Sequence, residues 1–202
     1  MEEALNLSRE LKNDGMVAQT LAFQGDTAYY GGDSKSAHSY YERAAQAAAH
    51  SKEPDKLLIA KTGLAKADIE AGRAAIAITS LRSVAKQSEG QGFAYLAVDC
   101  SVYMADAMMR NQDTLHARQE LERALLQTDK LGLKPLGARA HYLLATSLRA
   151  SGNLVEAQQH YRDSVQLLDV MRKEAGAEKL LQRSDLKTIY DEASRGAEAA
   201  KN

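Results

Sequence analysis

The sequence predicts an all-α protein made of stacked helical repeats, and three observations support this fold class. A small residue recurs every forty positions, at Ala37, Ala77, Ala117 and Ala157, and a fixed period of roughly 20–50 residues is typical of repeat proteins. Alanine, the best helix former, is abundant, whereas valine and isoleucine, which favour strands, are sparse. Both prolines fall between predicted helices, where a proline breaks no hydrogen bond.

Other positions along the chain share this period. Glycine or glutamine stands five residues before each of the four alanines, a small residue stands twelve before, and a large residue stands four after. In that order, the positions are Gly32, Gly72, Gln112 and Gly152; Gly25, Ala65, Ala105 and Ala145; and Tyr41, Leu81, Leu121 and Tyr161. The small residues are expected to let helices approach closely, while the large residue fills the gap beside them.

Apolar residues at steps of three and four divide each repeat into two amphipathic helices. Glycine at the turn can end the first helix in the left-handed conformation, and Asp33 or Asn153 can cap the second. Gln112 replaces the glycine in one repeat, which predicts a strained turn, and Arg73 replaces the capping residue in another. The predicted helices are 16–31 and 34–50, 55–71 and 73–88, 92–111 and 113–131, and 136–151 and 153–174.

The sequence predicts one further helix at each end of the chain. Ala4, Leu7 and Leu11 recur at helical spacing, so one more helix is expected within 1–15, resembling the second half of a repeat, as in a fragment of a longer chain. Ser184 opens a helix over 184–198, which is expected to cap the array. The predicted segments are 1–15, four repeats within 16–174 (16–54, 55–91, 92–134 and 135–174), and 175–202 as capping helix and tail.

Composition and charge argue against several classes of protein. The formal net charge is −1 and the charges are interleaved, which argues against binding nucleic acid or an anionic membrane. No stretch approaches the roughly eighteen apolar residues of a membrane span. Cys100 is the only cysteine, which excludes an intrachain disulfide and a cysteine zinc cluster. The N-terminus has neither the basic nor the apolar region of a secretory signal, so a cytoplasmic location is expected.

The periodic positions resemble the tetratricopeptide repeat, which has a small residue in the first helix, glycine at the turn, a small residue in the second helix and an aromatic residue four later. The resemblance covers residues 16–174. It departs from the family in its period of forty instead of about 34 residues, and in lacking the first-helix tryptophan, whose places hold Leu21, Lys61, Ser101 and His141. The resemblance implies a right-handed superhelix of four hairpins, with first helices lining a concave groove that binds proteins or peptides.

The resemblance also implies which residues face that groove. They are Asp26, Tyr29, Tyr30, Lys66, Ile69, Asp106, Met109, Arg110, Arg139, Tyr142 and Arg149. The surface runs from acidic and aromatic to basic, so a peptide with an anionic stretch near the three arginines is complementary to it. Tyrosines are favoured interface anchors, which makes Tyr29 or Tyr30 the first candidate. The alternative is that these residues are solvated helix faces whose charges pair along the surface.

Residues with catalytic or metal-binding chemistry form no recognisable motif. The five histidines include no HExxH pair, so they are expected at the surface or at the groove edge, with no metal and no other cofactor. Cys100 lies among apolar residues and is expected to be buried instead of nucleophilic. The groove acids, such as Asp26, Asp99 and Asp106, are spread along the repeats, which disfavours convergent carboxylates, so an enzyme is not expected.

The function predicted from the sequence is a non-catalytic scaffold that docks a peptide or a partner domain in a concave groove, as a module of a larger regulatory or signalling protein. The alternative is a self-associating structural module, a homo-oligomer whose groove stays empty. The two hypotheses differ in whether the groove or the exposed edges of the array make the contact.

Overall fold

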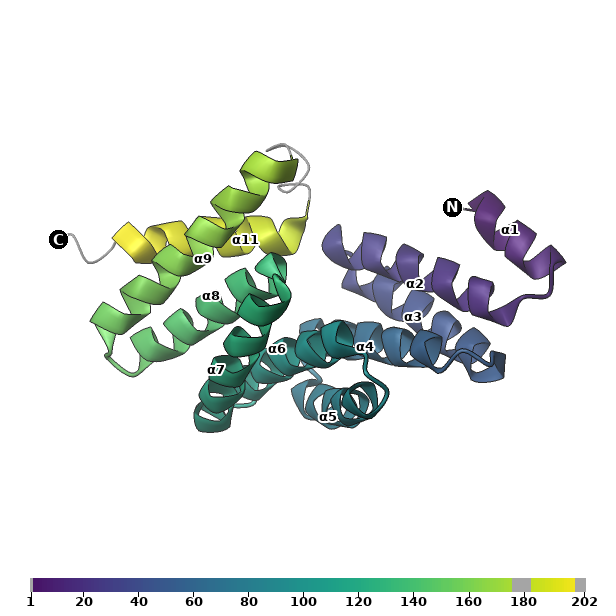
Figure 1. Cartoon of the computed structure of the whole chain (residues 1–202), viewed down its shortest axis with the longest axis horizontal. Coiled ribbons are helices and arrows are strands. Elements are labelled where there is room, and N and C mark those ends of the chain that lie inside the picture. Colours follow the sequence, from purple (N-terminus) through teal and green to yellow (C-terminus); the bar gives the residue numbers. More distant parts are fainter. Residues whose placement is uncertain (1, 176–182, 199–202) are drawn as a thin grey trace. The chain divides into compact units, whose positions relative to one another are not determined.

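The computed structural model describes residues 2–175 and 183–198 (Figure 1). These residues form ten α-helices and no strand, which confirms the all-α prediction, and none of these helices is both long and apolar enough to cross a bilayer. The helices are α1 (Glu2–Glu10), α2 (Asp14–Tyr30), α3 (Ser34–His50), α4 (Pro54–Glu70), α5 (Ala74–Gly90), α6 (Ala94–Arg110), α7 (Thr114–Leu131), α8 (Lys134–Ala150), α9 (Leu154–Ala175) and α11 (Ser184–Glu198). Residues 176–182 and 199–202 of the predicted C-terminal segment lie outside the described residues.

The helices of the four repeats begin and end within two residues of the predicted positions. The chain divides into two compact units, residues 1–100 and 101–202, with the boundary inside α6. In the first unit α2 packs against α3 and α4, α3 packs against α4, and α4 packs against α5. In the second unit α8 packs against α7 and α9, and α11 packs against both α8 and α9.

The turns between paired helices follow the predicted residues. Gln112 has a φ of 65°, in the left-handed region that glycine occupies in the corresponding turns, such as Gly72 with a φ of 77°. The predicted strained turn is therefore confirmed. The Asp33 carboxylate accepts a hydrogen bond at 3.0 Å from a backbone N–H in the first turn of α3, which caps this helix. Arg73, at the equivalent place, directs its guanidinium to the Asp68 carboxylate at 2.6 Å.

The first unit is organised around Tyr41, the large residue of the first repeat. Its side chain is 1% exposed, and its ring lies directly against Gly25 of α2 and Gly63 of α4. A Cβ on Gly25 would lie 2.6 Å from a ring carbon, and one on Gly63 would lie closer still. Close-packed interiors do not contain contacts this short, so both positions require glycine at this helix spacing. Tyr41 therefore determines how closely α2 and α4 approach α3.

The second unit repeats this arrangement around Tyr161, the large residue of the fourth repeat. Its ring packs with Ala145 of α8 and Ala193 of α11 in one buried cluster. A Cβ on Gly196 of α11 would lie 2.5 Å from the ring, so this helix also approaches through bare backbone. The contacts of α11 with α8 and α9 correspond to those of α4 with α2 and α3. Within its unit, α11 thus takes the place of the first helix of another repeat.

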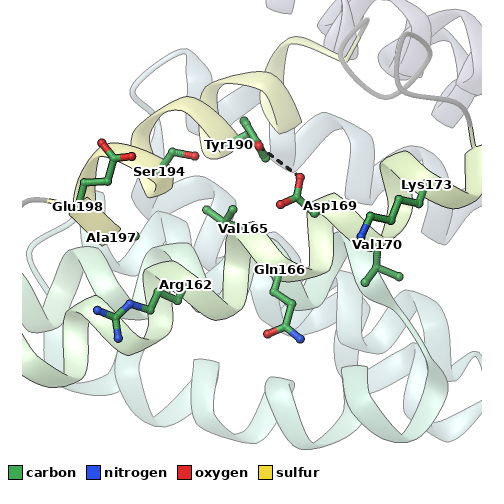
Figure 2. Close-up of a pocket in the computed structure, with 10 residues that line it drawn as sticks. All are labelled: Arg162, Val165, Gln166, Asp169, Val170, Lys173, Tyr190, Ser194, Ala197 and Glu198. Atoms are coloured by element: carbon green, nitrogen blue, oxygen red, sulfur yellow. Dashed lines mark hydrogen bonds between the residues drawn. The ribbon is translucent and has the colours of Figure 1, made fainter.

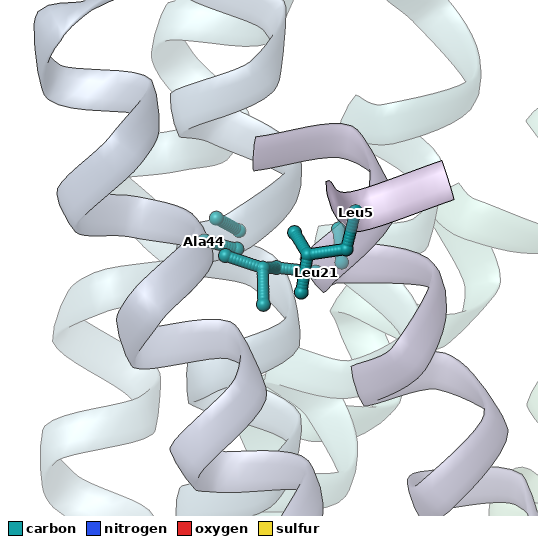
Figure 3. Packing of buried hydrophobic residues seen from close by; sticks show 5 residues of the cluster. Leu5, Leu21 and Ala44 are labelled. Atoms are coloured by element: carbon teal, nitrogen blue, oxygen red, sulfur yellow. The ribbon is translucent and has the colours of Figure 1, made fainter. Parts of the chain in front are cut away.

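The N-terminal helix α1 packs against α2 through Leu5, which lies in a buried cluster with Leu21, Ala22, Ala44 and Ala60 (Figure 3). This cluster joins α1 to α2, α3 and α4. The helix is therefore part of the first unit.

The apolar residues that indicate α1 in the sequence are not the ones that pack. Leu7 and Leu11 are 53% and 61% exposed, and Ala4 is exposed as well, whereas Leu5 and Ser8 are buried. Apolar residues lie on two sides of this short helix, so their spacing in the sequence does not show which side is buried. The side that packs is decided by the position of α2.

We predict that Gly63→Ala lowers the free energy of unfolding by about 1–3 kcal/mol, because the added methyl group overlaps the Tyr41 ring and forces it to shift. Urea unfolding followed by circular dichroism measures this change. Gly90→Ala is the matched control, since a Cβ at Gly90 would point into open space, and it should leave the stability unchanged or raise it by up to about 1 kcal/mol. Equal effects of the two substitutions would contradict the packing argument.

Candidate partner-binding surface

In the first unit, predicted groove residues of α2 gather beside Tyr41. The Tyr41 hydroxyl donates a hydrogen bond to Asp26 Oδ1 at 2.6 Å. Burial, and then the charge of Asp26, raise the pKa of Tyr41 well above its ordinary value, so the phenol keeps its proton and donates it. Tyr29 and Tyr30 meet edge to face, with ring centroids 5.4 Å apart. Tyr29 is 7% exposed and Tyr30 is half-buried, so Tyr30 is the tyrosine that reaches the surface.

Lys66 and Asp99 form a buried ion pair in the same unit. Lys66 Nζ lies 2.6 Å from Asp99 Oδ2, and the two residues are 6% and 4% exposed. Burial, the largest single influence, lowers the pKa of Lys66, but the charge and hydrogen bond of Asp99 together with the neighbouring Tyr30 and Tyr29 raise this pKa above its ordinary value. Removal of one partner from a buried pair typically costs about 3–5 kcal/mol. The charge of Lys66 thus compensates Asp99 inside the fold.

Three predicted contact residues of the first unit lie in its interior. Tyr29, Lys66 and Ile69 are 7%, 6% and 1% exposed. A partner that docks on this unit reaches Asp26 and Tyr30, which are half-buried, before it reaches those three. The repeat position identifies which helix carries a residue, but not how deeply the neighbouring helices bury it. Tyr29, Lys66 and Ile69 therefore offer little surface to a partner.

In the second unit, Arg139 of α8 is the centre of a charge network. Its guanidinium lies 3.5 Å from Asp106 Oδ2 and 2.9 Å from Asp185 Oδ2, and stands 4.6 Å from the centroid of the Tyr103 ring. Arg183 also binds Asp185, at 2.8 Å. Burial alone raises the pKa of Asp185, but the hydrogen bond from Arg183 and the charge of Arg139 lower it below its ordinary value. Arg139 is 8% exposed and balances two carboxylates within the unit.

The last turn of α6 carries the other predicted residues of this unit. Arg110 Nε donates a hydrogen bond to Asp106 Oδ1 at 3.0 Å; Arg110 is exposed, whereas Asp106 is 5% exposed. Met109 beside it is half-buried. The structure thus brings Asp106, Arg110 and Arg139 together, and the carboxylate lies between two of the three arginines that the sequence assigned to an anionic peptide.

Helix α11 covers part of the α8 surface on which the sequence placed groove residues. The Tyr142 hydroxyl donates a hydrogen bond to Glu192 of α11, and Arg139 binds Asp185 of the same helix. Burial, and then the contact with Glu192, raise the pKa of Tyr142 above its ordinary value. Arg149, two turns further along α8, remains exposed. Arg149 is therefore the predicted contact residue of α8 that a partner reaches directly.

An open pocket of about 400 Å³ lies between α8, α9 and α11, lined by Arg149, Tyr161, Glu192, Arg195 and Gly196. The Arg149 guanidinium stands 5.7 Å from the centroid of the Tyr161 ring. Arg149, Glu192 and Arg195 are all exposed. The pocket therefore presents two cations and one anion beside the buried Tyr161 ring. The sequence predicted Arg149 here but not Arg195, because α11 was assigned only a capping role.

A second pocket of about 570 Å³ lies between α9 and α11 (Figure 2). At one side of it the Tyr190 hydroxyl donates a hydrogen bond to Asp169 Oδ1 at 3.2 Å. Its other charged residues include Arg162, Lys173 and Glu198, so both signs of charge are present. The mixed lining gives this pocket no preference for a ligand of one charge. The sequence did not predict it, because it forms where α11 meets α9.

Two histidines meet across the α8–α9 hairpin. The Nδ1 atoms of His141 and His160 are 2.9 Å apart, and Asp163 Oδ2 lies 3.9 Å from the first and 4.0 Å from the second. Burial, and then the neighbouring His160, lower the pKa of His141, which favours a neutral imidazole. Both side chains are half-buried, and the sequence did not predict that they meet; the hairpin register places position 141 opposite 160. That register was the signal that could have revealed the pair.

Cys100 is buried, as predicted. It is 0% exposed, and its Sγ lies 3.5 Å from Thr62 Oγ1. Burial raises the pKa of the Cys100 thiol to about 12, so the thiolate that a nucleophilic role requires is disfavoured at neutral pH. The three groove acids considered for catalysis from the sequence each have a partner in the structure. Asp26 binds Tyr41, Asp99 binds Lys66 and Asp106 binds Arg110.

Comparisons with known proteins show similarity at the level of the fold. No protein-family model matches the chain, and no curated protein sequence matches it significantly. The crystal structure of aspartyl phosphate phosphatase F from Bacillus subtilis is similar with a TM-score of 0.71 and 14% identity; the match covers 97% of this chain and 52% of that one, so this chain spans about half its length. The crystal structure of BtubC (BKLC) from P. vanneervenii has a TM-score of 0.67, 17% identity and coverages of 99% and 85%. Both likenesses show a helical-repeat fold.

We predict that Asp185→Asn loosens α11, because Arg139 and Arg183 lose a charged partner. Hydrogen bonds to charged groups contribute about 1.5–3 kcal/mol, so amide hydrogen exchange in α11 should accelerate at least tenfold at neutral pH. Asp191→Asn, an exposed site on the same helix, is the control and should change little.

The effect of Asp185→Asn on the free energy of unfolding depends on pH. The pKa of Asp185 is lowered from 3.8 on folding, so its contribution is complete above that value and is lost as the pH falls through the lower folded-state pKa. Unfolding free energies of the wild type and Asp185→Asn should therefore converge as the pH falls below about 4. A difference that persists undiminished at lower pH would contradict the assignment.

Proposed function

We propose that this chain is a tetratricopeptide-like interaction module that binds an acidic peptide segment of a protein partner and catalyses no reaction. The observation that carries this proposal is the open pocket beside Arg149, where a contact residue expected from the sequence is exposed and is joined by Arg195. Guanidinium groups suit carboxylates, because each can donate two parallel hydrogen bonds to the two oxygens. Two of them in one pocket favour an aspartate, a glutamate or a terminal carboxylate.

The rest of the pocket supports an anionic ligand. The Tyr161 ring is buried and lies 5.7 Å from the Arg149 guanidinium, so this cation–π contact helps to hold the cation at the pocket. Glu192 accepts the hydrogen bond of Tyr142, which uses part of its negative charge within the protein. The two arginines therefore dominate the electrostatic field that an approaching anion meets.

Membership of the tetratricopeptide family and a cytoplasmic location belong to the same proposal. The forty-residue period, the packing of Tyr41 and Tyr161 on small residues and the helical-repeat neighbours support the family assignment. The first neighbour is named as a phosphatase. At 14% identity that likeness concerns the fold, and no phosphatase activity is proposed for this chain.

We predict that the chain binds fluorescent peptides enriched in Asp and Glu more tightly than length-matched peptides enriched in Lys and Arg. Fluorescence anisotropy measures both sets. Arg149→Ala and Arg195→Ala should each weaken binding of the acidic set by tenfold or more, because each removes a charge-assisted hydrogen bond of about 1.5–3 kcal/mol. Binding should also weaken with added salt.

Arg123→Ala is the matched control for these variants. Arg123 is an arginine on α7 that pairs with Glu120 at 2.8 Å, and its side chain is 72% exposed. The Arg123→Ala variant should bind acidic peptides with the affinity of the wild type. The same affinity for all three variants, or no preference for acidic peptides, would reject the pocket as the binding site.

Self-association is the second candidate, and exposed leucines on α7 favour it. Leu115 and Leu126 are 65% and 70% exposed, and their spacing of eleven residues places them on one helical face. Under this hypothesis light scattering shows a dimer that Leu126→Lys disrupts. A monomer that binds acidic peptides supports the peptide-binding proposal, whereas a dimer without peptide affinity replaces it.

A further inference from the structure

We propose that His141, His160 and Asp163 form a binding site for a divalent transition-metal ion of the zinc class. The three residues belong to the second unit, His141 to α8 and the other two to α9. Among the described residues their donor atoms converge, with all three within 4.8 Å of one another. Two imidazole nitrogens and a carboxylate oxygen are ligands that Zn²⁺ accepts in proteins.

The distances between the donor atoms fit one metal ion. The two Nδ1 atoms are 2.9 Å apart, and Asp163 Oδ2 lies 3.9 and 4.0 Å from them. The point equidistant from the corners of a triangle with these sides lies about 2.1 Å from each corner, which agrees with Zn–N bonds of about 2.0–2.1 Å and Zn–O bonds of about 2.0–2.2 Å. Small side-chain shifts place the ion out of this plane and leave a fourth position for water.

The surrounding residues orient these three ligands for metal binding. Gln159 Nε2 donates a hydrogen bond to Asp163 Oδ1 at 2.9 Å, which leaves Oδ2 directed toward the histidines. His160 and Asp163 are three residues apart on α9 and therefore share a helical face. The side chains of His141, His160 and Asp163 are 17%, 20% and 31% exposed, so an ion reaches them from solvent while the rings stay held.

Without a metal ion, the two histidine rings are joined by a hydrogen bond. At 2.9 Å one imidazole donates its Nδ1–H to the other, so the two rings hold each other by a hydrogen bond. Metal binding requires both rings to be protonated at Nε2 instead, which changes the tautomer of one ring without changing its charge. The ion then links α8 to α9 directly and stabilises the folded hairpin, because the three ligands are brought together only in the folded chain.

Isothermal titration of the full chain with ZnCl₂ tests this proposal, with MgCl₂ as the negative control because Mg²⁺ prefers oxygen ligands. We expect one Zn²⁺ per chain, a higher melting temperature with Zn²⁺, and no effect of Mg²⁺. His160→Ala and His141→Ala should each lower the affinity at least a hundredfold. Gln159→Ala should lower it by about 10–100-fold, as loss of a hydrogen bond to a ligand commonly does.

His116→Ala is the matched control, because His116 of α7 and Asp113, the residue that caps this helix, form a second pair three residues apart, with His116 Nδ1 2.8 Å from Asp113 Oδ1. It should bind Zn²⁺ like the wild type. Substitution of Co²⁺ for Zn²⁺ adds a second readout, since the intense visible absorption of a four-coordinate ion should appear in the wild type and disappear in folded His160→Ala. Absence of Zn²⁺ binding at micromolar concentrations, or binding that His116→Ala removes and His160→Ala spares, would overturn the assignment.

Discussion

Large rings that lie against glycine or alanine hold this fold together where one helical pair meets the next. Tyr41 contacts Gly25 and Gly63, so one residue of α3 sets the distance to both α2 and α4. Tyr161 packs in the same way with Ala145 and Gly196. A ring on bare backbone permits a closer approach than two branched side chains do, and a densely packed interior tolerates no added methyl group there. This packing requirement explains why small residues recur every forty positions in the sequence.

The same constraint explains why α11 is more than a cap. The surface beside Tyr161 must be filled, and α11 fills it in the way α4 fills the surface beside Tyr41. In doing so it brings Asp185 to Arg139 and Glu192 to Tyr142. Polar groups of α8 that would otherwise meet solvent are thereby used inside the unit. The proposed contact surface is displaced to the edge of α11, where two arginines flank an aromatic ring.

The proposed metal and peptide sites both follow from the register of the last hairpin. The turn at the end of α8 places His141 opposite His160. The same register places Thr146 beside Tyr161, with their hydroxyl oxygens 3.3 Å apart. Tyr161 in turn forms one wall of the pocket that holds Arg149. The metal site lies on α8 and α9, and the peptide pocket lies between these two helices and α11, so a metal ion would hold in place two of the three helices that shape the pocket.

The sequence by itself determined the features that depend on neighbouring residues. Helix boundaries, the strained turn at Gln112 and the cap at Asp33 were predictable because turn conformation and capping depend on a few adjacent groups. The periodic tyrosines and small residues were predictable for a related reason, since each repeat packs in the same way. Of the candidate site, the resemblance to the repeat family placed Arg149 and Tyr30 among the expected groove residues, and these side chains are exposed and partly exposed.

Only the tertiary structure decided which polar residues are buried and which partners they have. Lys66 pairs with Asp99, and Arg139 pairs with Asp185, across separations that no helical period encodes. The short helix α1 presents apolar residues on two sides, and its neighbours selected Leu5 over Leu7. The physical reason is that periodicity shows which residues share a face of one helix, whereas burial and charge pairing depend on which other helix covers that face.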